Sequence, residues 1–293
     1  MFDTVTRLLI LLLVFFIWLS PDRGFATSVD PKIARKIINM SGRQRMLSQR
    51  MSAASCLAMA GVDAERRRTV ASDAHAEFQR VLTALQHGDD EWGVAAETEE
   101  QVLSSLHTVG EVWNEVGPSI LQLSVGDLHT VVLNQMVGGN VPLLQSSNAV
   151  VQDLVQLYGA GVMDAERAKT IDIAGRQRML SQRMMKEACL LAVGVRIEQT
   201  ADSLKSTMAL FQTSLADLLH GNAGVGVLTP PNAEIKTQLQ KVQGLWEAYQ
   251  TGLSLIEADS EASRLTLGDL ANQSDLLLAE MNLAVGLYTS LAK

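Results

Sequence analysis

The ten-residue segment Gly42-Arg43-Gln44-Arg45-Met46-Leu47-Ser48-Gln49-Arg50-Met51 occurs a second time, unchanged, from Gly175 to Met184. The two occurrences are offset by 133 residues, and at the same offset Cys56 matches Cys189 and Trp113 matches Trp246. The chain is therefore a tandem duplication of a unit of about 130 residues, and two copies are too few for a solenoid. We expect the first unit to cover residues 27–158 and the second to cover residues 159–293.

Composition restricts the class of protein. Of the 293 residues, 47% are hydrophobic and only 19% are charged, which indicates a folded chain with a sizeable core. The formal net charge of −8 argues against general binding of nucleic acids, whose protein partners are usually basic. Two cysteines are too few for a disulfide scaffold or a four-thiolate zinc site.

Residues 1–26 resemble a secretory signal. Arg7 precedes an apolar run from Leu8 to Leu19, and Gly24 and Ala26 form a small-x-small pattern, so we expect cleavage after Ala26. The competing interpretation is an uncleaved anchor, but about 12 residues of helix cover only roughly 18 Å of a hydrocarbon layer ~30 Å thick. In a bacterium, the mature chain would be a soluble protein of the periplasm, where its two cysteines could oxidise.

The remainder predicts an all-α fold of two tandem up-down-up-down four-helix bundles. In the first copy we expect one helix over Pro31–Gly61, a second over Asp63–His87, a third around Trp113 and a fourth ending near Leu157. No apolar–polar alternation typical of strands is found. Gly88 and Gly221 follow the second helix of each copy and are typical of helix C-termini.

The first helix of each copy has a second packing face besides its core face. In the first copy that face holds positions spaced by four, three, four, three and four residues, as in a heptad seam. Five of its six positions are identical in the second copy, which a merely solvated face would not require. The six are Ile38, Gly42, Arg45, Gln49, Ser52 and Cys56, and their counterparts are Ile171, Gly175, Arg178, Gln182, Met185 and Cys189.

Arginine on a packing face is costly unless a negative group meets it. If Arg45 and Arg178 faced each other, one planar oxyanion such as nitrate, nitrite or a small carboxylate could bond to both guanidinium forks. A nearby glycine would let the ligand approach the backbone closely. The alternative is that these arginines pair with Asp or Glu on neighbouring helices, and spacing alone leaves both interpretations open.

The motif resembles the signature of the N-terminal sensor domain of type IV pili methyl-accepting chemotaxis transducers, and the P-box (Gly-x-x-Arg-Met-x-Ser-x-Arg) of nitrate/nitrite sensor kinases. The matching residues are Gly42, Arg45, Met46, Ser48 and Arg50 in copy one, and Gly175, Arg178, Met179, Ser181 and Arg183 in copy two.

The resemblance implies a periplasmic four-helix sensor in which two paired first helices bind one nitrate between them. It suggests a ligand site formed by Gly42, Arg45, Gln49, Gly175, Arg178 and Gln182, with supporting roles for Arg43, Ser48, Arg50, Arg176, Ser181 and Arg183. The chain departs from the sensor kinases at Gln49 and Gln182, where they carry an aromatic residue. Unlike those sensors, it is expected to have no transmembrane helix and no output domain.

Two copies on one chain suggest that the motif helices pair within the chain, as a pseudo-dimer, and the alternative is a homodimer. Cys56 and Cys189 occupy equivalent places on the seam, three turns beyond the arginines. They could form a disulfide if the helices are parallel and close, or remain small buried residues.

We therefore expect a periplasmic receptor for a small anion that relays occupancy to a separate membrane-bound sensor or chemotaxis partner. The alternative is a non-catalytic structural or interaction module associated with type IV pili or the chemotaxis machinery. No catalytic residues, metal ligands, cofactor or nucleic-acid partner are expected, and the chain is not expected to be an enzyme.

Overall fold

The computed structural model describes residues 29–126, 129–159 and 162–291, so the expected signal segment 1–26 lies outside the described residues. The described residues form eight α-helices and one short 3₁₀ helix. The first copy contains α1 (Pro31–Met59), α2 (Ala64–His87), α3 (Glu100–Ser124) and α4 (Thr130–Gly159). The second contains α5 (Ala165–Ala192), α6 (Ile197–His220), η1 (Ala223–Val225), α7 (Ala233–Leu253) and α8 (Glu261–Ser290).

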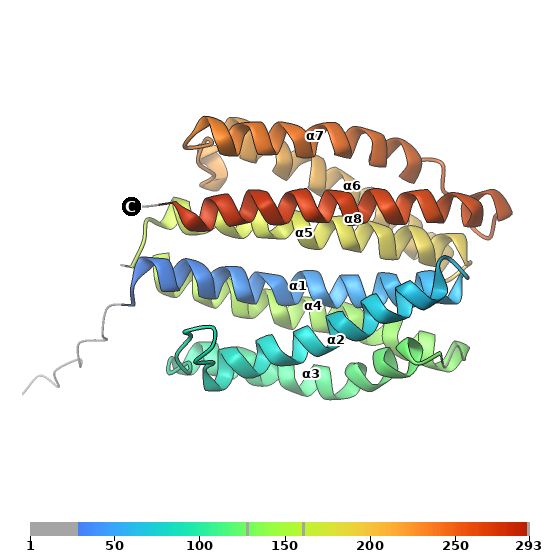
Figure 1. The fold of residues 1–293 in the computed structure, drawn as a ribbon, viewed down its shortest axis with the longest axis horizontal. Helices are drawn as coiled ribbons and strands as arrows, with labels where there is room; N and C mark the ends of the chain where they lie inside the picture. The colour runs from blue at the N-terminus through green and yellow to red at the C-terminus, as the bar shows by residue number, and fades with distance from the viewer. Residues whose placement is uncertain (1–28, 127–128, 160–161, 292–293) are drawn as a thin grey trace, which may run out of the picture.

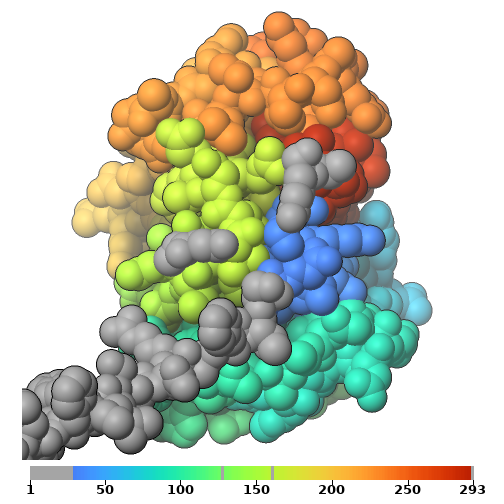
Figure 2. Space-filling model, turned by 90° about the vertical axis from the view of Figure 1, so that its left-hand side faces the viewer, coloured from blue at the N-terminus to red at the C-terminus, as the bar shows by residue number. Residues whose placement is uncertain are grey.

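The helices stack in pairs, with α6 and α7 at one side, then α5 and α8, then α1 and α4, and α2 and α3 at the other side (Figures 1 and 2). The four central helices are therefore α1, α4, α5 and α8 (Figure 1). Helices α1 and α5 run parallel at the centre, and α1 packs against α5 more extensively than against any other helix. The two motif helices are thus paired within one chain.

The predicted all-α class and the helix order are confirmed, with bounds within a few residues of those expected. In place of strands, the described residues contain two isolated bridges, Asp89 with Val94 and Asn222 with Val227, in equivalent connections of the two copies. Gly88 ends α2 with φ +84°, and a Cβ there would come within 2.9 Å of the Ala96 backbone nitrogen. Glycine is therefore required at this helix end.

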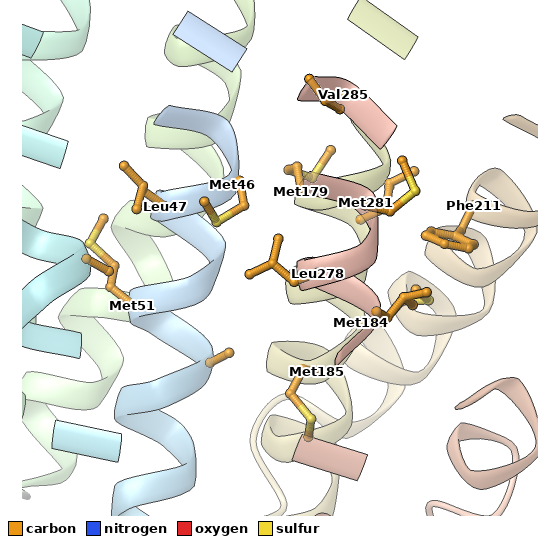
Figure 3. Packing of buried hydrophobic residues seen from close by; sticks show 14 of the residues in the cluster. Met46, Leu47, Met51, Met179, Met184, Met185, Phe211, Leu278, Met281 and Val285 are labelled. Atoms are coloured by element: carbon orange, nitrogen blue, oxygen red, sulfur yellow. The ribbon is translucent and has the colours of Figure 1, made fainter. Parts of the chain in front are cut away.

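The core is continuous through both copies. One cluster of buried hydrophobic residues extends from α1 to α8. In Figure 3, Met46 on α1 points toward the second copy, where Met179 and Leu278 lie. The two four-helix units therefore share one hydrophobic core and do not have two separate ones.

Among the described helices, none combines the length and the apolarity that crossing a bilayer would require.

A disulfide joins the two copies at one end of the α1–α5 interface. Cys56 and Cys189 are bonded, with their Cα atoms 6.1 Å apart. Both residues are buried, at 1% and 0% exposure. The bond fixes the parallel register of α1 and α5, because it joins equivalent positions of the two motif helices.

The first prediction concerns this disulfide. Closing a loop of more than 100 residues in the unfolded chain stabilises the fold by about 2–5 kcal/mol. We expect the C56S/C189S double variant to lose about that much in denaturant unfolding, and to keep its helical circular dichroism. Alkylation followed by intact-mass measurement provides the check on the oxidised parent protein. Two reactive thiols in the folded parent would show that the bond does not form.

Candidate functional site

The two motif arginines are buried in the middle of the α1–α5 interface. Arg45 on α1 is 1% exposed and Arg178 on α5 is 3% exposed. Each follows its helix's glycine by three residues, which places glycine and arginine on the same helix face. The predicted packing face is confirmed, since Ile38, Gln49 and Cys56 are buried as well.

The two guanidinium groups converge beside the glycines. A Cβ at Gly42 would lie 3.4 Å from Arg45 Nη2 and 3.6 Å from Arg178 Nη2. A Cβ at Gly175 would lie 3.4 Å from Arg178 Nη2 and 3.7 Å from Arg45 Nη2. Because neither glycine carries a side chain, two arginine donors from different copies lie close to the helix backbone at this point.

Arg45 has a carboxylate partner. Its Nη2 lies 2.7 Å from Asp172 Oδ1 on α5, and both side chains are almost fully buried. Its Nη1 donates to Asn148 Oδ1 on α4 at 3.0 Å. Of the two interpretations left open by the sequence, Arg45 therefore follows the second, an ion pair with an acidic residue of a neighbouring helix.

Arg178 has only neutral oxygens as hydrogen-bond acceptors, at long distances. Its Nη2 donates to the Asn39 backbone carbonyl at 3.4 Å, its Nη1 to Asn282 Oδ1 at 3.5 Å and its Nε to the Gly175 carbonyl at 3.5 Å. Within the described residues, no carboxylate lies within 4.0 Å of its nitrogens. Burial, together with the positive charges of Arg43 and Arg45, lowers the pKa of Arg178 to about 9, and the more distant carboxylate of Glu77 only partly opposes this. At neutral pH, Arg178 remains a buried cation without an adjacent counter-ion.

Asp172 remains ionised in this environment. Burial by itself would raise its pKa, but the positive charges of Arg45, Arg176 and Lys169 outweigh burial and hold the pKa below the usual value. Arg176 Nη2 lies 3.3 Å from Asp172 Oδ2. The buried Arg45, Arg178 and Asp172 together carry one net positive charge.

Gln49 and Gln182 lie in a second polar layer, and their hydrogen bonds in the described structure do not reach the arginine pair. Gln182 Nε2 donates to Ser274 Oγ at 3.0 Å. Gln49 Oε1 accepts a hydrogen bond of 2.8 Å from Lys186 Nζ, which also donates to Asn140 Oδ1 at 2.7 Å. Lys186 is 7% exposed, and burial lowers its pKa to about 8.

The residues expected in supporting roles bond mainly to the backbone, to acidic side chains and to the motif glutamines, since Arg50 Nη1 donates to Gln182 Oε1 at 3.2 Å and Gln49 Nε2 donates to Ser48 Oγ at 3.0 Å. Ser48 and Ser181 donate through Oγ to the carbonyls of Arg45 and Arg178, each at 2.8 Å. The other basic residues of the motif form ion pairs, most of them partly exposed: Arg43 with Glu77 at 2.8 Å, Arg50 with Asp275 at 3.1 Å, Arg176 with Asp172 at 3.3 Å, and Arg183 with Glu187 at 2.7 Å.

A cavity of about 280 Å³ lies between α1, α2 and α8, and neither Arg45 nor Arg178 is among its lining residues. Its lining includes Arg43, Glu77 and Asn282, and Asn282 also contacts Arg178. The side chain of Asn282 therefore lies between the cavity and the buried guanidinium of Arg178. The described residues contain no cluster of His, Cys, Asp or Glu suited to a metal ion.

Sequence reasoning missed Asp172 and Lys186. Both are positions where the copies differ, because Asp172 corresponds to Asn39 and Lys186 to Ala53 at the 133-residue offset. A comparison of the copies for changes in charge would have found both residues. Their partners would have stayed unknown, since Asp172 pairs with a residue 127 positions earlier in the chain.

An all-α protein made of two four-helix units, with a buried polar seam between their first helices, has the architecture of a helical-bundle sensor domain. Residues 33–136 and 165–272 each match the family model described as Type IV pili methyl-accepting chemotaxis transducer N-term. The two matches together cover more than half of the chain, so the chain belongs to this family. Membership supports a role as a signalling sensor.

The chain is also similar to the Methyl-accepting chemotaxis protein McpN of Pseudomonas aeruginosa. The two sequences are 37% identical over 124 residues, which are 42% of this chain and 22% of the relative. The similarity thus spans about a fifth of the relative's length and about one copy of the duplicated unit.

The second prediction uses the buried amine of Lys186. Because its folded-state pKa of about 8 lies below the usual 10.5, the unfolded chain binds more protons between these values and stability rises with pH. We expect the stability of the parent protein, relative to K186M, to increase by about 1–2 kcal/mol from pH 8 to pH 9.5. Denaturant unfolding of both proteins across this range measures the difference, and parallel pH profiles would contradict the prediction.

Proposed function

We propose that this protein is a periplasmic receptor for a small monovalent oxyanion of the nitrate type. The ligand would lie between α1 and α5, and its occupancy would be reported to a separate membrane-bound sensor or chemotaxis partner. The observation that carries the proposal is Arg178, a buried arginine that has only neutral acceptors at 3.4–3.5 Å. A buried, poorly compensated guanidinium is costly in the apo protein, and a bound anion would remove that cost.

The geometry beside Arg178 suits a planar anion with several acceptor oxygens. Arg45 Nη2 and Arg178 Nη2 both lie next to the backbone at Gly42 and Gly175. Guanidinium forks form paired, charge-assisted bonds with planar oxyanions, each contributing roughly 1.5–3 kcal/mol. Three or four such bonds support micromolar affinity after the ordering costs of binding.

Binding at this place would act directly on the interface between the two copies. The anion would add contacts to residues of both α1 and α5, and would favour whichever packing of the two helices brings the arginines together. A shift of population between two packings of this interface is the physical signal that a partner would detect. Family membership supports a partner in a chemotaxis or type IV pili system.

The second candidate function is a non-catalytic structural or interaction module associated with the same machinery. The Arg45–Asp172 ion pair of 2.7 Å favours it, because it shows that the fold can supply its own counter-ion for one motif arginine. The two functions differ in what Arg178 needs. A receptor leaves Arg178 available for a ligand, and a structural module does not respond to anions.

The third prediction tests the receptor directly. At 100 times the dissociation constant, a ligand that binds only the folded state adds about 2.7 kcal/mol of stability, which raises the melting temperature by several degrees. We expect this rise for residues 27–293 in sodium nitrate compared with sodium chloride at equal ionic strength.

The R45A/R178A variant is the control for the general effects of the two salts on stability. In that variant the nitrate-specific rise should disappear. A parent protein that melts at the same temperature in both salts would favour the structural module.

The fourth prediction tests the role of the glycines. A Cβ at either glycine would make only ordinary contacts of 3.4–3.7 Å with the guanidinium nitrogens, so the G42A/G175A variant should fold. Alanine also has a higher helix propensity than glycine, by about 1 kcal/mol per residue. The two methyl groups would fill the space beside the arginines, so we expect at least a tenfold loss of nitrate affinity in calorimetric titration. Unchanged affinity would place the ligand elsewhere.

A further inference from the structure

We infer that Asp172 is a built-in counter-ion that makes the site asymmetric and selects one monovalent anion, bound at Arg178. This inference rests on the proposed function, and it adds the charge class of the ligand and the residue that sets it. In this arrangement Arg45 is occupied by the protein's own carboxylate, and Arg178 provides the free charge.

The first support is the difference between the two copies beside the arginine pair. Asp172 on α5 and Asn39 on α1 occupy equivalent positions of the duplicated motif helix. Asp172 faces Arg45 of the other copy at 2.7 Å. Asn39 faces Arg178 of the other copy, but it offers only its backbone carbonyl, at 3.4 Å. The buried side-chain oxygen Oδ1 of Asn39 has no hydrogen-bond donor. Asp172 of the second copy neutralises Arg45. The first copy has a neutral asparagine, Asn39, at the equivalent position, so Arg178 receives no carboxylate there.

The second support is that Asp172 is firmly held. Its side chain is 0% exposed, and besides Arg45 it contacts Arg176 at 3.3 Å and Gln152 Nε2 at 3.4 Å. Lys169 Nζ lies 4.0 Å from Oδ2. A ligand anion would have to break several interactions to displace this carboxylate. Binding at Arg178, whose own bonds are long and to neutral atoms, breaks much less.

The consequence is selectivity by charge. Among the almost fully buried groups, two arginines and one carboxylate leave a single positive charge for the ligand to neutralise. Arg43, Arg176 and Lys169 are partly exposed, so solvent screens their charges. A divalent anion would bring a second, uncompensated negative charge into a buried site beside Asp172, which is strongly unfavourable. The native site should therefore accept nitrate and reject sulfate.

Exchanging the two residues between the copies tests the inference. The proteins are the parent chain of residues 27–293, D172N, N39D and the exchanged double variant N39D/D172N. Each is titrated calorimetrically with sodium nitrate and, separately, with sodium sulfate at matched ionic strength. Circular dichroism and thermal unfolding confirm that each protein is folded.

We expect four distinct results. The parent binds nitrate and not sulfate. D172N, with two unneutralised arginines, binds nitrate at least tenfold more tightly and gains sulfate binding. N39D, with a carboxylate beside each arginine, loses nitrate affinity at least tenfold. The exchanged variant has one free arginine again, now Arg45, and recovers nitrate binding to within a few-fold of the parent.

The outcomes separate this inference from the proposed function. If no protein in the series binds either anion, the proposed function fails. If the parent binds nitrate but D172N and N39D change its affinity less than twofold, the function stands and the role of Asp172 is overturned. Should D172N fail to fold, N39D carries the test, because it adds a partner to Arg178 and removes none.

Discussion

The structure depends on how two arginines are accommodated inside one helix–helix interface. Arg45 and Arg178 are nearly fully buried on parallel helices, and their like charges repel each other. Each copy gives its own arginine a neutral hydrogen-bond acceptor. Asn148 on α4 accepts from Arg45, and Asn282 on α8 accepts from Arg178. Only Arg45 receives a full counter-ion, from Asp172 of the other copy. Arg178 therefore keeps an uncompensated positive charge inside the interface.

Duplication within one chain makes that asymmetry available. A homodimer of identical sensor domains must place the same residue on both sides of its symmetry axis. Here the two sides have diverged, with Asn39 opposite Asp172 and Ala53 opposite Lys186. Lys186 crosses the interface to bond Gln49 and Asn140 of the first copy, so a second buried cation also belongs to one half alone.

The α1–α5 interface is held by covalent and ionic links near the C-terminal ends of the two helices. The Cys56–Cys189 disulfide fixes the two helices at one end, three turns beyond the arginines. Asp275 links α8 to α1 and α2 by ion pairs of 3.1 Å with Arg50 and 2.8 Å with Arg67. The first residues of α1 and α5 lie at the opposite end of the interface (Figure 1), where Arg35 Nε donates to the Thr289 carbonyl on α8 at 3.0 Å.

The sequence by itself determined the duplication, the all-helical class, the helix order and the packing face of the motif helix. These features follow from local spacing and from identity between the copies, which do not depend on distant contacts. The tertiary structure decided that the motif helices pair in parallel within one chain, that Cys56 bonds to Cys189, and that Gln49 and Gln182 turn to another polar layer. It also decided which motif arginine is neutralised. Charge compensation in a buried interface depends on which side chains meet across helices more than a hundred residues apart, and no local pattern encodes that pairing.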